Sequence, residues 1–347
     1  MQIKEVGFSE WGRALPASGF DAFHSAEALR VLDDHGSGDL RLFGGFKGEQ
    51  PIGLVPIFVF EKLGGRLVTS PPLGFGIGRL GPVVMPTSPK RRKQESMNNE
   101  FARKIIEATD ADSASTIFRM VCDVRYGDPR PFEWAGFDIT PAFTYRLDLE
   151  SSTIEGVLES FSRDRRVEIR DRDDTNVEIR TGDLQDAKTI HEAMEERYRE
   201  QDMSVPVTWD FVRDLLAMIG DQARVYVAET TEGEFLSGMI VLYSADTAYN
   251  WKGGTKSTEQ VTSVSPNSLL HWQIIEDIFT DPSLDQIHVY DMYTANNERL
   301  SRYKSSFGGD LVPYYVVETA GVRKKIAEEV YRMAVSPKSP VDVNSFL

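Results

Sequence analysis

Apolar and polar positions alternate along the chain with two different periods. Residues that alternate every second position, or that form short apolar runs, indicate strands, whereas apolar residues spaced three or four apart indicate helices. Strands and helices interleave over most of the 347 residues, which predicts an α/β (α+β) fold. The predicted strands are 39–47, 50–60, 115–124, 143–149, 176–180, 224–230, 235–244, 248–253, 287–293 and 311–318, and the predicted helices are 25–34, 100–109, 151–172, 184–201, 208–219, 267–280 and 298–307.

The order of these elements is similar in the two halves of the chain. A length of 347 residues suits two domains of roughly 150 residues each. We therefore expect an N-terminal module at 1–148, a C-terminal module at 149–320, and a terminal helix with a tail at 321–347.

Composition limits the classes of function. The chain is 41% apolar and 27% charged, as is usual for globular proteins. Its net charge is −15, of which −2 falls in residues 1–150 and −13 in the rest. An acidic surface disfavours binding to nucleic-acid phosphates, so we expect no DNA partner, and an RNA partner would need a local basic patch. The basic run 90–93 is expected to be a solvated surface.

The chain has one cysteine, Cys122, which excludes an intramolecular disulfide and lies in an apolar run that predicts burial. No basic segment followed by an apolar stretch opens the chain, and no run of about 18 apolar residues occurs. These patterns predict a cytoplasmic protein without a transmembrane segment.

Common cofactor and nucleophile motifs do not occur. The five histidines are scattered without metal-ligand spacing, and one cysteine cannot build a Cys/His zinc site. There is no Walker A sequence and no GxSxG elbow. Residues 74–78 resemble part of a dinucleotide fingerprint, but the third glycine is missing and residues 79–82 do not begin a helix. We expect neither a metal nor a resident cofactor.

An ordered series of short segments carries a family resemblance. The segments are Ser70–Gly74, Phe143–Leu149, Ser162–Arg170, Pro266–Trp272, Tyr290–Tyr293 and Tyr303–Gly308. Together they resemble the FemAB-like branch of the GNAT acyltransferases, which includes peptidoglycan-bridge aminoacyltransferases, over about residues 20–318. In the last segment Tyr303 stands where the family usually has phenylalanine in Phe-Lys-x-x-Phe-Gly.

The resemblance implies tandem GNAT-like modules with mixed, mostly antiparallel sheets flanked by helices. It also implies acyl or aminoacyl transfer to an amine acceptor on a peptide, glycan or lipid-linked precursor. Aminoacyl-tRNA and acyl-CoA are both open as the donor, because the chain lacks the inserted coiled-coil arm of some tRNA-using members. It also lacks the Arg/Gln-x-x-Gly-x-Gly/Ala loop of acyl-CoA enzymes. The alternatives are a non-catalytic module that binds a peptide or glycan, and an acyl-CoA N-acetyltransferase.

Lys304 and Asp291 are the candidate catalytic residues that the resemblance implies. Acyl transfer to an amine forms an oxyanion, which a lysine ammonium or N–H groups can stabilise, and Lys304 could alternatively contact phosphate. Asp291, at the end of a predicted strand, could orient the amine or act as a base. The structural alternatives are a surface lysine and an aspartate that holds a neighbouring loop.

Arginines supply candidate phosphate contacts. Arg163, Arg166 and Arg170 lie at i, i+3 and i+7 and share a helical face, and guanidinium forks suit phosphate, although interleaved acids also fit an ion-paired surface. One of Arg197 and Arg199 resembles the arginine that the family directs toward the acceptor's phosphates.

Aromatic residues are the remaining candidates for substrate binding. Tyr249 and Trp251 alternate on one face of a predicted strand and could line a sugar or acyl pocket, although a core position is equally compatible. Tyr303, next to Lys304, could form part of an apolar wall.

Overall fold

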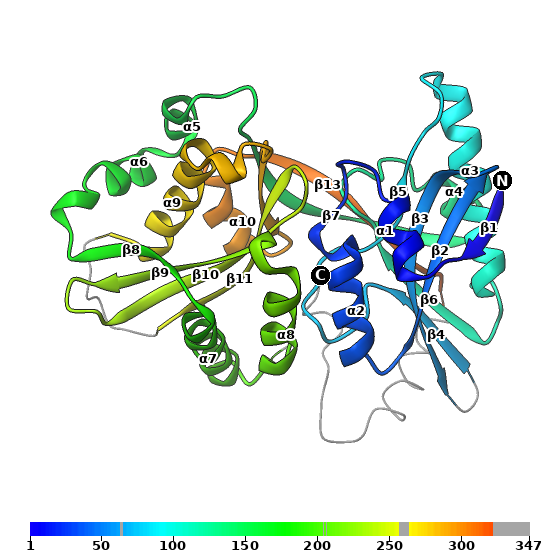
Figure 1. The fold of residues 1–347 in the computed structure, drawn as a ribbon, viewed down its shortest axis with the longest axis horizontal. Coiled ribbons are helices and arrows are strands. Elements are labelled where there is room, and N and C mark those ends of the chain that lie inside the picture. The colour runs from blue at the N-terminus through cyan, green and yellow to red at the C-terminus, as the bar shows by residue number, and fades with distance from the viewer. Residues whose placement is uncertain (63–64, 204, 206, 257–263, 322–347) are drawn as a thin grey trace. The chain divides into compact units, whose positions relative to one another are not determined.

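The computed structural model describes residues 1–62, 65–203, 205, 207–256 and 264–321. The chain forms two compact units, one made of Met1–Ala142 and Pro313–Leu347 and the other of Phe143–Val312. Each unit is a sheet with helices packed on it, as the ribbon in Figure 1 shows. The α/β fold expected from the sequence is therefore confirmed.

Unit 1 contains a sheet with strand order β1-β2-β3-β4-β6-β13, with β5 paired to β3. All of its neighbouring strands are antiparallel except β4 and β6, which are parallel and are connected through α3. Its elements are β1 (Gln2–Glu5), α1 (Phe8–Ala14), η1 (Ala22–His24), α2 (Ala26–His35), β2 (Asp39–Lys47), β3 (Gln50–Lys62), β4 (Gly65–Ser70), β5 (Val83–Val84), α3 (Arg91–Thr109), β6 (Thr116–Val121), α4 (Arg130–Trp134) and the last part of β13 (Asp310–Thr319).

Local chemistry explains the hairpin and the core of unit 1. The β2–β3 hairpin turns at Gly48, whose φ of 64° lies in the left-handed region that glycine adopts without steric cost. Phe101 and Ile105 of α3 pack on Val55 and Phe118 of the sheet. Helix α3 thereby covers one face of the sheet, next to the parallel strands β4 and β6.

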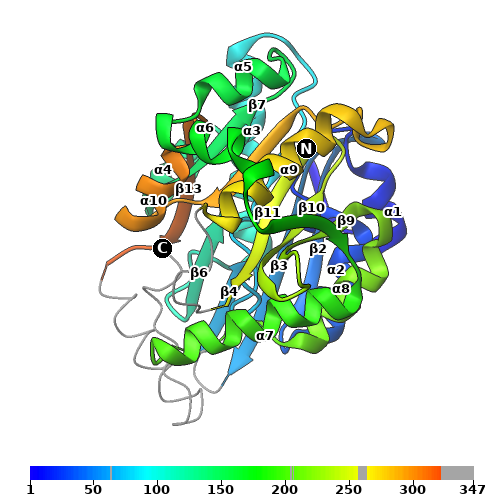
Figure 2. The same cartoon turned by 90° about the vertical axis from the view of Figure 1, so that its left-hand side faces the viewer.

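Unit 2 contains a sheet with strand order β7-β12-β11-β10-β9-β8, in which only β11 and β12 are parallel. Helices α5, α6 and α9 cover one face and α7 and α8 the other (Figures 1 and 2). Its elements are β7 (Phe137–Asp148, which begins in unit 1), α5 (Ile154–Ser160), α6 (Arg163–Arg170), η2 (Arg172–Asp174), β8 (Val177–Gly182), α7 (Leu184–Glu200), α8 (Trp209–Ile219), η3 (Gly220–Gln222), β9 (Ala223–Thr230), β10 (Phe235–Tyr243), β11 (Thr247–Thr255), α9 (Pro266–Thr280), η4 (Pro282–Leu284), β12 (Val289–Thr294) and α10 (Glu298–Ser305).

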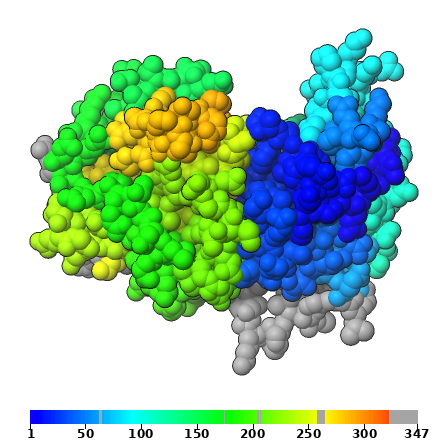
Figure 3. Space-filling view, in the orientation of Figure 1, coloured from blue at the N-terminus to red at the C-terminus, as the bar shows by residue number. Residues whose placement is uncertain are grey.

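Two predicted helices have different bounds in the structure. The expected helix 151–172 is two helices, because the Ser162 hydroxyl accepts the N–H of Arg165 and begins a new helix there. The expected helix 100–109 begins earlier, at Arg91, so the basic run forms its exposed first turn, which stands out from the body of unit 1 (Figures 1 and 3).

The expected domain limits, 1–148 and 149–320, differ from the two units by a few residues at each end. The reason is that β7 and β13 both run from one unit into the other. Whether the two modules are independent domains stays a prediction. The expected terminal helix lies outside the described residues, apart from its first residue.

Candidate active site

The parallel pair of unit 2 separates partway along its length. β11 and β12 are paired from Thr247 and Val289 to Tyr249 and Asp291. From Asn250 onward β10 is the one strand paired with β11 in the described part of the chain. The other edge of β11 therefore has no strand partner there among the described residues, and an unpaired strand edge is a place where an extended ligand can pair with a sheet.

A bulge marks the same place on β11. Asn250 is opposite Val241 and Lys252 is opposite Ile240, so Trp251 is the extra residue in the ladder. Bulges re-aim side chains and are frequent near active sites. The strand thus changes the direction of its side chains where it leaves β12.

The turn after β12 is fixed by the ammonium group of Lys304. The Nζ of Lys304, a residue with 8% exposure, donates to the carbonyl oxygens of Met292 at 2.5 Å and Thr294 at 2.6 Å. Between these carbonyls, Tyr293 has a φ of 65°, which is uncommon for a residue with a bulky side chain. Two of the three N–H donors of the lysine therefore hold a strained turn in place.

Asp291 and Thr144 complete the support of this turn. The Asp291 carboxylate, fully buried, accepts the backbone N–H of Tyr293 at 2.8 Å and the Thr144 hydroxyl at 2.6 Å. The Thr144 hydroxyl also contacts the carbonyl of Tyr293. The other carboxylate oxygen lies 3.5 Å from Nε of Arg146 on β7. Asp291, which precedes residues 292–294 in the sequence, and Lys304, which follows them, therefore both hold this turn.

An aromatic cluster lies behind Lys304. The His271 Nδ1 is 2.7 Å from the Tyr290 hydroxyl, and the His271 ring centroid is 4.7 Å from that of Phe307. Burial, together with the charges of Lys304 and Arg165, lowers the pKa of His271 to about 3. The imidazole is therefore neutral at neutral pH and adds no charge beside the ammonium.

Tyr303 belongs to the same cluster. Its ring centroid is 5.2 Å from that of Phe307, and the Arg165 guanidinium lies 5.6 Å from its ring centre. Burial raises the pKa of Tyr303 above its usual range, so the phenol stays protonated. The structure thus places this predicted substrate contact in the packing beside Lys304.

Tyr249 and Trp251 are both buried, at 4% and 5% exposure. Tyr249 is the register partner of Asp291, and its hydroxyl lies 3.5 Å from that of Ser244. Trp251 packs against Phe211 of α8 with ring centroids 6.3 Å apart. Both therefore lie where β11 leaves β12, close in the sheet to Asp291.

The predicted arginines lie on other elements. Arg163 and Arg170 are exposed on α6, and Arg166 donates to the carbonyls of residues 159 and 161, at the end of α5. Arg197 and Arg199 are exposed in the last turn of α7, where cations complement the helix dipole. No described hydrogen bond or ion pair joins these arginines to the Lys304 turn.

Three residues of the site escaped prediction. Thr144 and Arg146 stand at alternate positions of a segment that carries the resemblance, so their common strand face was a usable signal. The left-handed φ of Tyr293 has no signal in the sequence, because it results from contacts with distant residues.

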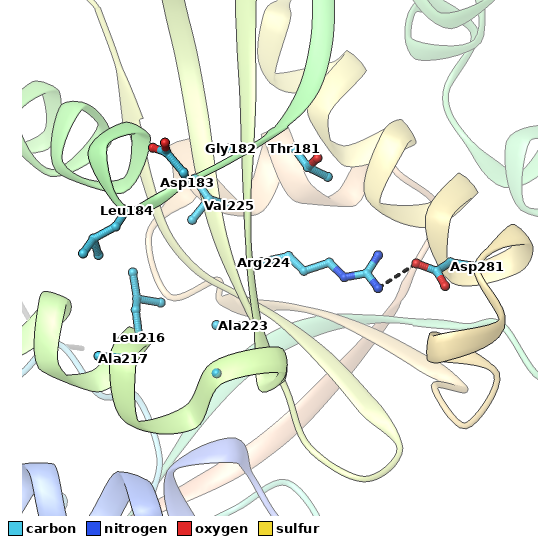
Figure 4. A pocket seen from close by; sticks show the side chains of 11 residues that line it. Thr181, Gly182, Asp183, Leu184, Leu216, Ala217, Ala223, Arg224, Val225 and Asp281 are labelled. Carbon is cyan, nitrogen blue, oxygen red and sulfur yellow. Dashed lines mark ion pairs between the residues drawn. The ribbon is translucent and has the colours of Figure 1, made fainter.

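A cavity of about 570 Å³ lies elsewhere in unit 2 (Figure 4). Leu184 and Leu216 form its apolar side, and Arg224 crosses it to reach Asp281 at 2.6 Å. None of the predicted site residues lines this cavity. It is therefore separate from the candidate site at the end of β12.

The described ranges contain no metal-binding cluster and no membrane-spanning helix. No three or more His, Cys, Asp or Glu side chains there are grouped so as to hold a metal ion. None of the described helices has both the length and the apolar character needed to cross a bilayer.

Comparisons with known proteins agree with this architecture. Residues 160–305 match the family model of the acetyltransferase (GNAT) domain. The structure of FemX is similar with a TM-score of 0.69 at 11% identity, covering 95% of this chain and 100% of that one. The C-terminal domain of a putative lysylphosphatidylglycerol synthetase from Agrobacterium fabrum is similar with a TM-score of 0.56 at 10% identity, covering 94% and 96%. No curated protein sequence matches the chain significantly.

Residues 160–305 therefore carry an acetyltransferase (GNAT) domain, and this domain supports an acyltransferase. The GNAT-like fold that the resemblance implies is confirmed, and the fold of FemX is similar over 95% of this chain. At such low identities the structural likeness establishes the fold, and the donor and the acceptor need separate support.

Proposed function

We propose that this protein transfers an aminoacyl group from aminoacyl-tRNA to an amine on a peptide, glycan or lipid-linked acceptor. The observation that carries the proposal is the buried Lys304 ammonium, held by two carbonyls where β11 and β12 separate inside the GNAT-like unit. FemX and the lysylphosphatidylglycerol synthetase domain share the fold, and the latter's name pairs a lysyl group with a lipid.

The proposed reaction is a direct acyl transfer. The lone pair of the acceptor amine attacks the ester carbonyl carbon, which forms a C–N bond and places negative charge on the carbonyl oxygen. The C–O ester bond then breaks, and the proton lost by the amine ends on the departing hydroxyl. The protein contributes mainly by positioning the two substrates and by stabilising the intermediate charge.

In this proposal Lys304 supplies the stabilising charge. Its contacts with the carbonyls of Met292 and Thr294 fix the ammonium before substrate arrives, so little reorganisation is needed when the oxyanion forms. Asp291 maintains the turn through Tyr293 rather than acting as the base. Tyr249 and Trp251 shape the adjacent acyl or sugar pocket.

In this proposal four of the five predicted arginines contact phosphates of a substrate, and Arg166 does not. Arg163, Arg170, Arg197 and Arg199 are exposed and free to meet a large polyanionic substrate, whereas Arg166 already binds the end of α5. The chain's net charge of −15 requires that such contacts be local.

The donor is tested directly on the purified protein. We would incubate it with radiolabelled aminoacyl-tRNAs, or in parallel with labelled acetyl-CoA, each with a lipid and small-molecule extract of cells. Label moving from tRNA into a new product supports the proposal. Transfer from acetyl-CoA alone contradicts the proposed donor, and transfer from neither favours a binding module.

Lys304→Met tests the proposed role of the ammonium. We expect kcat to fall by about 100- to 1000-fold, as when another oxyanion-stabilising group is removed. Arg302→Met, on the same helix with a side chain 81% exposed, is the matched control and should leave kcat unchanged. Unchanged turnover in a folded Lys304→Met protein would remove the central step of the mechanism.

A further inference from the structure

Lys252 is a partly buried lysine that follows the bulge of β11. Its Nζ lies 5.4 Å from the centre of the Trp251 ring. It stands three residues beyond Tyr249, where pairing with β12 has ended. The side chain therefore belongs to the same separated part of the sheet as the candidate site.

The ammonium of Lys252 has no hydrogen-bond acceptor and no carboxylate partner among the described residues. Lys304 has two backbone carbonyls as partners, and two buried or partly buried arginines of unit 2 have carboxylates. Arg146 faces Asp291 at 3.5 Å, and Arg224 faces Asp281 at 2.6 Å. Lys252 is thus a charge partly removed from water without the compensation that its neighbours receive.

Helix α7 packs directly on this stretch of β11. A Cβ added to Gly254 would lie 2.0 Å from the carbonyl oxygen of Ile190, so helix and strand backbones are in close contact. The next residue of α7, His191, is buried and has its Nε2 3.3 Å from the Glu195 carboxylate. The charge of Lys252 contributes to the lowered pKa of His191. Glu195 of α7 is therefore paired with the histidine.

This arrangement is unfavourable for the free protein. Burial lowers the pKa of Lys252 to about 8, so desolvation opposes the charged form, and no residue in the described ranges offsets it. A buried or partly buried charge without a partner costs stability that a hydrophobic residue would not cost. A ligand with negative charge would offset that cost when it binds.

We propose that Lys252 binds an anionic oxygen group, a carboxylate or a phosphate, on one of the two substrates of this site. The inference rests on the proposed function for the identity of the reaction, but the binding of the anion does not depend on it. A lysine is a compact point charge, which suits one oxygen of either group and does not require the bidentate geometry of an arginine.

Two sources share this chemistry. A carboxylate would come from a peptide-like or amino-acid portion of a substrate. A phosphate would come from the donor or from a lipid- or nucleotide-linked acceptor. The position of Lys252 beside Trp251 places the anion next to an aromatic surface, which is compatible with both.

The first experiment follows the Lys252 side chain in the free protein. With ¹³C-labelled lysine, the Cε resonance of Lys252 is assigned by its absence in Lys252→Met and titrated with pH, with inorganic phosphate or acetate added in parallel. We expect the pKa of Lys252 to rise by about one unit or more with the anion that the site accepts, since an opposite charge favours the ammonium. Lys188, which is 44% exposed and pairs with Glu192 at 3.8 Å, is the control resonance and should not move.

The effect of each anion on the Lys252 titration distinguishes a phosphate ligand from a carboxylate ligand and shows when the proposal fails. A shift with phosphate alone assigns a phosphate, and a shift with acetate alone assigns a carboxylate. If neither probe moves the Lys252 titration, or if Lys252 and Lys188 respond equally, the proposal is wrong.

The second experiment uses the transfer reaction once its substrates are known. Lys252→Met should raise KM for the anionic substrate about tenfold or more, with kcat changed much less, and Lys252→Arg should restore most of the affinity. Equal KM values in the wild type and Lys252→Met overturn the inference while leaving the proposed function intact. A protein that binds the anion through Lys252 but transfers nothing contradicts the proposed function instead.

Discussion

Each unit contains one parallel strand pair joined by a helix, and the two pairs end differently. In unit 1, β4 and β6 stay in register over five positions, from Arg66 and Thr116 to Ser70 and Met120. In unit 2, β11 and β12 are paired over three positions, and beyond these both strands continue without pairing with each other. We call the end of the β4–β6 pair in unit 1 the closed end, and the end of the β11–β12 pair in unit 2, where the two strands separate, the open end.

The loop after β4 closes the end in unit 1. The backbone N–H groups of Leu80 and Gly81 donate to the carbonyl of Val121 at 3.1 Å and 2.8 Å, and the Ser70 hydroxyl donates to the Leu80 carbonyl at 2.7 Å. A Cβ on Gly81 would lie 2.5 Å from the Cα of Cys122, so the loop lies directly on the chain that leaves β6. Unit 1 thus fills with its own backbone the place that corresponds to the proposed ligand site of unit 2.

The loop is secured by a buried arginine, and removing that residue should give the largest loss of stability. Arg79 and Asp21 are each 1% exposed with 3.8 Å between their charged groups, and Arg79 lies 5.3 Å over the Tyr314 ring. We expect Arg79→Met to lower the free energy of unfolding by about 3–5 kcal/mol, because a buried carboxylate loses its cation. Urea unfolding measures this loss.

The control for this prediction is Arg41→Met. Arg41 pairs with Asp39 on the surface, so its loss should cost less than about 1 kcal/mol. Transfer activity per folded molecule should survive Arg79→Met, since the open end belongs to unit 2. Lost activity in the folded variant would show that the closed end also takes part in the reaction.

Two adjacent glycines test the open end with a smaller expected effect. Gly254→Ala would place a Cβ 2.0 Å from the Ile190 carbonyl, whereas the nearest atom to a Cβ at Gly253 is 3.5 Å away. We expect Gly254→Ala to lower the free energy of unfolding by about 1–3 kcal/mol through overpacking of α7 on β11. Gly253→Ala should be near neutral. Equal thermal shifts for the two variants would contradict the close contact.

The effect that is smallest at neutral pH, and that grows on acidification, is a pH dependence from His271, behind the open end. Its pKa in the folded protein is about 3, below the value near 6.5 of an unfolded histidine, so unfolded chains bind the additional proton. Stability should therefore fall as the pH drops from about 6.5 toward 3, by about 1.4 kcal/mol per pH unit from this residue.

His271→Gln should reduce that slope, which unfolding measurements at several pH values would show. His24, behind the closed end, is a useful comparison because burial lowers its pKa while Asp123 opposes the shift. His24→Gln should change the slope less than His271→Gln. The reverse order would mean that the charges of Lys304 and Arg165 do not act on His271 as inferred.

The order of strands and helices followed from periodicity because each element buries one face. The break at Ser162 depended on a cap that competes with a continuous helix, and both outcomes fit the same pattern of apolar residues. Lys304 and Asp291 were predicted from two short segments of the family resemblance, Tyr303–Gly308 and Tyr290–Tyr293. The side-chain cage around Tyr293 and the unpaired Lys252 depend on strand separation and on contacts across the sheet, which no local pattern encodes.

The arginines show the opposite difficulty. Their shared helical face is real for α6, but Arg166 is used to terminate α5 through main-chain carbonyls. The spacing of residues on one helix cannot distinguish an arginine that is free to bind phosphate from one that donates to the last carbonyls of a neighbouring helix. Only the position of the preceding helix decides between them.

Unit 1 is discontinuous in sequence, since Met1–Ala142 is completed by residues beyond Pro313. Its closing strand, β13, pairs with β6 through Val316, Val317 and Glu318. During synthesis on the ribosome the whole of unit 2 emerges before that strand does. Unit 2 can therefore begin to fold while unit 1 still lacks the edge strand of its sheet. A chain that ended near residue 312 would leave the sheet of unit 1 without that strand.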